Sequence, residues 1–327
     1  MIKLFFSKIW NLIRAIKNPP LFFYWFHHYI KKHVSTNLAY KIAKKNESDY
    51  DRLGIRLIQL DTYDKSGQCC HPDIIIFDKK YWLVCTPYPY GMEDYENPCV
   101  FSGESLTSLK HVGTSPIAYP SGVSYGNHLS DPCLFIVNNS LFCLYRDTIN
   151  KNGVVINKLL AKQYLSNNQW GDSFTVYQSD IDGLLSPAIF QLKNNIYLFY
   201  VSYIKKQLIL RCLVMDDSFN VITQETCHLG NCPSNMDIWH IAITKNQDDS
   251  LKGLFLLRDR TNKNSMELVC TRCSYEFTKW EIQKPVIIPN NIKEIVNFPY
   301  KSCFIPNTDK ILLSYKDNNS RYCLSIV

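Results

Sequence analysis

The stretch from His71 to Tyr88, HPDIIIFDKKYWLVCTPY, has the pattern of a buried strand, a tight polar turn and a second strand that ends in aromatic residues. The same pattern returns four more times, at spacings of roughly 50 to 65 residues. The later copies begin at Ser130, Ser186, Asp237 and Ser302. Five matched hairpins at such spacing are typical of a radial β architecture.

The chain offers a way to close the ring. Each hairpin is followed by a third and a fourth predicted strand, except that the fifth unit has sequence for three strands only. We expect residues 55–60 to supply its outer strand, because a closed ring leaves only short, protected strand edges. The sequence therefore predicts an all-β, five-bladed β-propeller over residues 47–327. The alternative is a two-sheet sandwich, which also shows strands at turn-punctuated spacing.

Residues 1–46 differ from the rest in composition, with nine Lys and Arg and no acidic residue. Apolar residues from Ile2 to Ile16 recur at the three-four spacing of one helix face, which predicts an N-terminal amphipathic helical extension. The aromatic run at 21–30 is too short to span a membrane. Basic residues beside bulky aromatics predict a helix lying on an anionic membrane surface. The alternative is a helical cap packed against the propeller.

The 13 cysteines include no pair of spaced doublets, and Cys270 and Cys273 would face opposite sides of a strand. The sequence therefore predicts no metal site and no cofactor. The odd cysteine count and the lack of a secretory signal favour a reducing compartment. The basic excess lies on one apolar helical segment, so nucleic acid is not an expected partner. We predict a cytoplasmic protein, peripheral at the inner face of the membrane.

In a propeller the innermost strands run beside the central channel, so the residues that open the five hairpins should converge. The predicted catalytic residues are Asp73, Asp131, Asp237 and Glu96. The predicted substrate-binding residues are His71, Tyr88, Arg146, Ser186, Trp239, His240 and Arg258, and Lys301 should lie with them. Carboxylates beside histidine and arginine suit glycosidic chemistry, in which one group moves a proton and another stabilises charge on the sugar.

Several of these residues have a purely structural alternative. Asp131 before Pro132 can cap a turn, and Arg146 and Arg258 can form surface pairs with the aspartates that follow them. The functional interpretation is favoured because the polar breaks coincide in all five repeats, whereas the intervening strands stay apolar.

The hairpin Asp131-Pro132-x-Leu-Phe, followed by Leu-Phe-x-Leu-Tyr-Arg, resembles the blades of five-bladed propeller carbohydrate enzymes. These enzymes include the family 43 arabinanases and xylosidases, the levansucrase and invertase group, and the mannoside phosphorylases. The resemblance spans residues 55–327, and residues 71–73, 86–88 and 95–98 are similar to their first blade. It implies a carbohydrate substrate.

The resemblance also implies a catalytic set that this chain departs from. Family 43 hydrolases carry a base Asp on the first blade, an orienting Asp on the second and an acid Glu on the third. Asp131 matches the second-blade position. His71 replaces the first-blade Asp, with a carboxylate displaced to Asp73, and Ser186 replaces the acid, with Asp182 nearby. A missing proton donor costs about a hundredfold to ten-thousandfold in rate, whereas transfer from an activated donor with a phosphate leaving group needs none.

The leading prediction is therefore a membrane-associated glycosyl- or phosphoribosyl-type transferase of surface-polysaccharide assembly. Its expected partners are an activated sugar donor, a glycan or lipid-linked glycan acceptor, and the anionic membrane through residues 1–46. One alternative is a family 43-type glycoside hydrolase that takes its acid from Asp182 or Glu96. The other is a non-catalytic glycan-binding propeller.

Overall fold

A computed structural model describes residue 50 and residues 52–120, 128–151, 154–204, 207–246, 248–273 and 277–327. The predicted amphipathic segment at 1–46 lies outside these residues, so the helix and its membrane contact stay predictions. Within the described ranges, no helix has the length and apolar character needed to cross a membrane.

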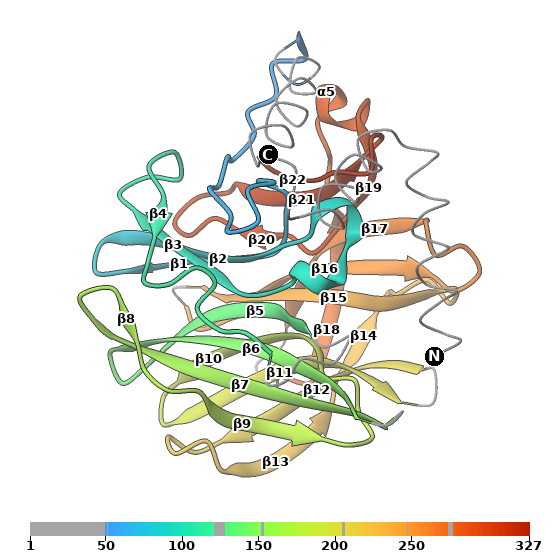
Figure 1. The fold of residues 1–327 in the computed structure, drawn as a ribbon. Coiled ribbons are helices and arrows are strands. Elements are labelled where there is room, and N and C mark those ends of the chain that lie inside the picture. The colour runs from blue at the N-terminus through green and yellow to red at the C-terminus, as the bar shows by residue number, and fades with distance from the viewer. Residues whose placement is uncertain are drawn as a thin grey trace.

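The described residues form five β-sheets, one for each predicted hairpin (Figure 1). The first blade contains β1 (Cys69–Phe77), β2 (Lys80–Pro87), β3 (Cys99–Gly103) and β4 (Lys110–His111). The second contains β5 (His128–Val137), β6 (Ser140–Lys151), β7 (Val154–Ser166), β8 (Gln169–Trp170) and β9 (Phe174–Ser179). The third contains β10 (Leu185–Leu192), β11 (Asn195–Ile204), β12 (Gln207–Met215) and β13 (Val221–Thr226).

The last two blades vary this plan. The fourth contains β15 (Met236–Lys245), β16 (Leu251–Asp259), β17 (Met266–Cys273), β18 (Lys279–Pro285) and the short parallel strand β14 (His228–Gly230). The fifth contains β19 (Val296–Pro299), β20 (Cys303–Phe304), β21 (Ile311–Asp317) and β22 (Tyr322–Ile326). The short helices are η1 (Pro89–Gly91), η2 (Glu93–Tyr95) and α5 (Asn290–Lys293). The five-bladed propeller prediction is confirmed, and the sandwich is excluded.

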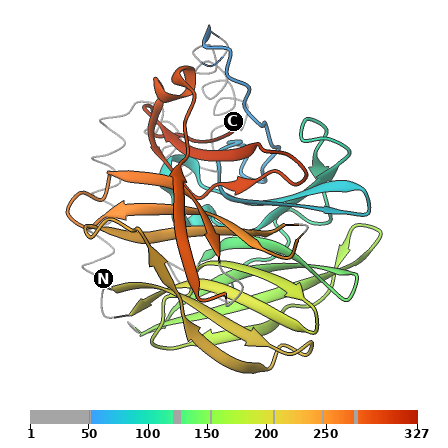
Figure 2. The same ribbon diagram turned by 180° about the vertical axis from the view of Figure 1, so that it is seen from behind.

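The start of the described chain closes the ring, as predicted. Leu57 forms an antiparallel bridge with Ser325, and the Ile58 amide donates a hydrogen bond to the Leu324 carbonyl at 2.9 Å. Figures 1 and 2 both show this segment, in blue, beside the red strands of the fifth blade. The fifth sheet thereby gains an outer partner from the opposite end of the sequence.

Hydrophobic cores lie between successive blades. Trp82 and Val84 of the first blade share one core with Leu134 and Cys143 of the second. A larger core joins the fourth, fifth and first blades and includes Leu254, among others. All 13 cysteines are free thiols, and most of them are buried in these cores. Buried thiols of this kind pack as small apolar side chains.

A bulge interrupts the inner strand at the opening of each of the first three hairpins. His71, Asp131 and Ser186 stand there with φ of 53°, 52° and 49°, and each precedes a proline. In each case two residues of the inner strand oppose one residue of its neighbour. A bulge re-aims its side chains and bends the strand, so this repeated irregularity explains why polar residues recur at these points.

The fourth and fifth blades break their inner strands differently. In the fourth, the register shifts by one residue at Trp239. In the fifth, the inner strand is divided into β19 and β20, and Tyr300 and Lys301 lie between the two pieces. Every blade therefore has an irregular backbone at the corresponding position of its inner strand.

We expect replacement of Asp317 by alanine to destabilise the ring closure. Its Oδ2 accepts hydrogen bonds from the Tyr50 hydroxyl at 2.6 Å and from Arg321 Nε at 2.8 Å. Both Asp317 and Arg321 are buried. Removing one partner of a buried ion pair leaves an uncompensated charge, which costs about 3–5 kcal/mol. Urea unfolding would measure this loss, with the exposed Asp309→Ala as the control. Equal stabilities of the two variants would contradict this role.

Candidate functional site

Asp131 lies at the centre of a buried polar cluster where the inner strands begin. The residue is buried, with 1% of its surface exposed. Its Oδ1 lies 3.4 Å from His71 Nε2 and 3.5 Å from His240 Nδ1, and its Oδ2 lies 3.2 Å from Arg146 Nη2. The structure thus brings together four of the predicted site residues, from the first, second and fourth blades.

Arg146 is held in place by its own blade and the next. Its Nε and Nη2 donate to Ser130 Oγ at 3.1 and 2.8 Å, and its Nη1 donates to the Gly183 carbonyl at 3.1 Å. An arginine fixed in this way keeps a permanent positive charge against the Asp131 carboxylate. Arg146 therefore belongs to the interior cluster and is not a simple surface residue.

The cluster keeps Asp131 ionised. Burial raises the pKa of Asp131, but His71, Arg146, His240 and Lys301 lower it by more, so its pKa lies well below the usual range. Burial lowers the pKa of His71 to about 4 and that of His240 well below its usual value, against the opposing Asp131 charge. Arg146 therefore holds Asp131 in its ionised form, and burial favours the neutral form of both imidazoles.

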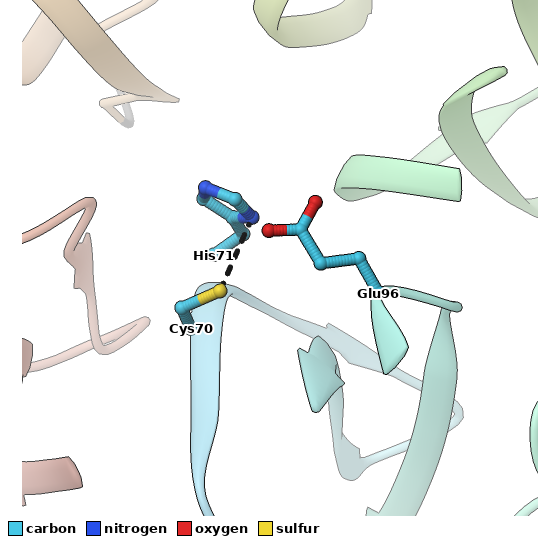
Figure 3. A group of neighbouring side chains, drawn as sticks. All are labelled: Cys70, His71 and Glu96. Carbon is cyan, nitrogen blue, oxygen red and sulfur yellow. Dashed lines mark hydrogen bonds between the residues drawn. The ribbon is translucent and has the colours of Figure 1, made fainter. Parts of the chain in front are cut away.

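Glu96 reaches the same cluster from the connection between β2 and β3 of the first blade. It follows η2 and is 4% exposed. Its carboxylate is directed toward the His71 ring in Figure 3, and its Oε2 lies 3.7 Å from His128 Nε2. Burial, with the charges of Asp131 and Glu93, raises the pKa of Glu96 well above its usual value. Glu96 therefore keeps its proton under conditions in which Asp131 is ionised.

An aromatic border surrounds the histidines. The Tyr300 ring lies 5.2 Å from the His71 ring and 4.8 Å from the His240 ring. Tyr88 stacks beside Tyr300 at 6.5 Å, and Trp239 lies 5.5 Å from His240. Tyr88, Trp239 and Tyr300 are only partly buried. Flat side chains in this position offer stacking faces for a sugar ring.

Two predicted catalytic residues, Asp73 and Asp237, lie elsewhere, which corrects the prediction that all the hairpin openings share one pocket. Asp73 Oδ2 accepts a hydrogen bond from the Leu134 amide at 2.8 Å and lines a separate channel cavity of about 380 Å³ with Lys301. Asp237 Oδ1 accepts a hydrogen bond from Arg260 Nε at 2.8 Å and lines a different hollow, together with Arg258 and Lys263. The alternation of strand side chains explains this separation, because the bulge aims His71 at the cluster and leaves Asp73 further along the channel.

Ser186 has a structural contact in place of the predicted substrate contact. Its hydroxyl donates to the Ile241 carbonyl at 3.0 Å and accepts from the Ile241 amide at 2.9 Å. It is fully buried and joins the inner strands of the third and fourth blades. The position that resembles a third-blade acid is therefore occupied by a link between blades.

Sequence reasoning missed Tyr300 and His128 as members of the site. Tyr300 stands beside Lys301 at the opening of the fifth hairpin, and His128 lies three residues before Asp131 on β5. Each is a polar or aromatic residue close to the polar opening of a hairpin, a position that the repeat pattern had located. Alignment of the repeats by their bulges would have placed both near the channel.

Among the residues that the structure describes, two groups of side chains have the donor atoms to hold a metal ion. One is His71, Asp131 and His240, and the other is Cys70, His71 and Glu96, shown in Figure 3. In the first group, His71 Nε2, Asp131 Oδ1 and both nitrogens of His240 are buried without a hydrogen-bond partner. Imidazole and carboxylate donors suit zinc and related divalent metals.

The surroundings of the first group both support and oppose a metal ion. His71 Nδ1 lies 3.3 Å from Thr86 Oγ1, and an outer contact of this kind orients a metal-binding imidazole. Arg146 engages the other oxygen of Asp131, which leaves Oδ1 open. The positive charges of Arg146 and Lys301 oppose a further cation. The sequence prediction of no metal site rested on cysteine spacing, which cannot reveal donors contributed by three different blades.

No protein-family model and no curated protein sequence matches the chain. Solved structures do share its fold. An N-acetylgalactosamine deacetylase from F. plautii, in complex with blood group B trisaccharide, is similar at 16% identity over 80% of this chain and 88% of that chain, with a TM-score of 0.68.

Two glycoside hydrolases show the same likeness. The β-xylosidase/α-arabinofuranosidase CoXyl43, from a compost metagenome, is similar at 12% identity over 84% of this chain and 93% of that chain, with a TM-score of 0.58. An α-L-arabinanase from Cellvibrio cellulosa is similar at 13% identity over 79% and 90% of the two chains, with a TM-score of 0.56. The chain therefore has the five-bladed β-propeller fold found in family 43 glycoside hydrolases, as the sequence resemblance implied.

Proposed function

We propose that this protein is a carbohydrate hydrolase that cleaves a glycosidic bond, with Glu96 as the proton donor and Asp131 as the ionised partner. The observation that carries the proposal is the opposite displacement of two buried carboxyl pKa values within one cluster. Glycosidases use a protonated and an ionised carboxyl group on either side of the scissile bond.

Each carboxyl group has a distinct task in this proposal. Glu96 protonates the oxygen of the leaving sugar, because burial keeps its proton in place. Asp131 stabilises the positive charge that develops on the sugar ring, and Arg146 and the two histidines fix its orientation. Water then adds to the sugar carbon and gives a proton back to the Glu96 carboxylate, which restores the site. Tyr88, Trp239 and Tyr300 supply stacking surfaces at the border.

The prediction of a glycosyl- or phosphoribosyl-type transferase is wrong. It rested on the absence of an acid at Ser186, whereas the geometry supports Glu96 as an acid from another blade. The similar solved structures include glycoside hydrolases and a deacetylase, which favours the hydrolase alternative. A glycan remains the proposed partner, without an activated sugar donor.

A second candidate function is the metal-assisted removal of an acyl group from a sugar. It is favoured by the open donor atoms of His71, Asp131 and His240 and by the likeness to an N-acetylgalactosamine deacetylase. A divalent metal in such a site would polarise the acyl carbonyl and lower the pKa of a bound water. Glu96 would then move protons between the water and the leaving amine or alcohol.

One experiment separates the two candidates. The purified protein is incubated with N-acetylated and non-acetylated oligosaccharides, with EDTA or with added zinc or manganese, and products are identified by mass spectrometry. We expect new reducing ends that form equally well in EDTA. Release of acetate that stops in EDTA and returns with metal would favour the second candidate. In that case His240→Ala should also lose bound metal by elemental analysis, whereas the exposed His228→Ala should keep it.

A further inference from the structure

We infer that Arg258, supported by Trp239, forms a subsite for a negatively charged substituent on the sugar that neighbours the cleaved bond. The inference rests on the proposed carbohydrate substrate and adds the chemical class of that substrate. Arg258 is the penultimate residue of β16, and Trp239 lies at the register shift of the neighbouring strand β15.

Trp239 connects Arg258 to the catalytic cluster. The Arg258 guanidinium carbon lies 3.5 Å from the centroid of the Trp239 ring, a close cation–π contact. The Trp239 ring in turn lies 5.5 Å from the His240 ring, and His240 contacts Asp131. A sugar bound beside Trp239 would therefore be next to the sugar held at Asp131.

Within the described residues, no hydrogen bond or ion pair engages the Arg258 guanidinium. The nearest acid in register is Asp237, and its Oδ1 accepts from Arg260 Nε at 2.8 Å. Burial lowers the pKa of Arg258, against the opposing charge of Asp237. A partly buried guanidinium fixed against an indole, with open donors, suits the paired oxygens of a carboxylate, sulfate or phosphate.

The space beside Arg258 is large enough for a sugar and has an excess of positive charge. A hollow of about 810 Å³ is lined by Tyr203, Asp237, Arg258, Asp259, Arg260 and Lys263. Its acidic groups are engaged within the protein, since Asp259 accepts hydrogen bonds from Thr261 and from Asn235 at 2.7 Å or less. Arg258 and Lys263 are left to attract an anion, and the volume falls within the range of ligand sites.

The test compares acidic and neutral oligosaccharides that are otherwise matched. Binding of oligogalacturonates, galactose oligosaccharides, and sulfated or phosphorylated galactose oligosaccharides is measured by calorimetry at low and high salt. We expect tighter binding of an acidic series, and Arg258→Met should weaken it about tenfold or more, because hydrogen bonds to charged groups contribute about 1.5–3 kcal/mol. The preferred acidic series identifies the substituent as carboxylate, sulfate or phosphate.

Two matched variants distinguish a loss of the subsite from a loss of folding. Arg258→Lys keeps the charge and should retain part of the preference, while Arg272→Met removes an exposed arginine from the same blade and should change nothing. Three results would overturn the subsite. They are equal affinity for neutral and acidic probes, equal weakening of both by Arg258→Met, and no binding of any acidic probe. Preference for acidic probes without any cleavage would support the subsite while refuting hydrolysis. Cleavage of neutral glycans that is unaffected by Arg258→Met would support hydrolysis and refute the subsite.

Discussion

Replacement of Glu96 by glutamine is expected to lower kcat/KM on an oligosaccharide by about a hundredfold to ten-thousandfold, the usual contribution of a general acid. Glutamine fills the same space beside His71 and His128 but cannot donate a proton to the leaving oxygen. The loss should be far smaller on an aryl glycoside with a good leaving group, because such a bond breaks without protonation. Initial rates on the two substrates measure this difference.

A nearby carboxyl group provides the control for Glu96. Glu104 follows β3 in the same blade, is exposed, and is not among the charges that act on Glu96. Glu104→Gln should leave the rates on both substrates within about twofold, since an exposed charge is screened by solvent. Full activity of Glu96→Gln on the oligosaccharide would remove Glu96 from the mechanism and leave Asp182 as the remaining predicted acid.

Replacement of Asp131 by asparagine is expected to reduce kcat by about a hundredfold to a thousandfold, the scale of a lost electrostatic contact with the transition state. It should also shift the pH dependence. Activity requires protonated Glu96, so it is present below the pKa of Glu96 and is lost as the pH rises through that pKa. The Asp131 charge raises this pKa. The alkaline limb of the kcat/KM profile should therefore move to lower pH in the asparagine variant.

A conservative change at Arg146 tests the same coupling in the opposite direction. Arg146 lowers the pKa of Glu96, so Arg146→Gln should move the alkaline limb to higher pH. Thermal melting of both variants serves as the folding control, because Arg146 still has Ser130 and Gly183 as acceptors when Asp131 is changed. If the alkaline limb of the kcat/KM profile stays at the wild-type pH in both variants, Glu96 and Asp131 titrate independently.

Much of the fold could be predicted because its signals are local. Alternating apolar residues and tight polar turns specify each hairpin within a few residues, and five repetitions specify the ring. The closing segment at 55–60 could be predicted from the missing outer strand alone. The repeat openings also located His71, Asp131 and His240, because inner strands of a propeller must meet at the channel.

The sequence by itself determined the five blades, the closing segment and the set of residues near the channel. Only the tertiary structure decided which of them meet. Bulges at His71, Asp131 and Ser186 aim two of these side chains into one cluster and the third into a link between blades, whereas Asp73 remains deeper in the channel. The pKa values of Glu96 and Asp131 also depend on charges from several blades and on burial. Contacts between residues far apart in the chain set these properties, and no local pattern encodes them.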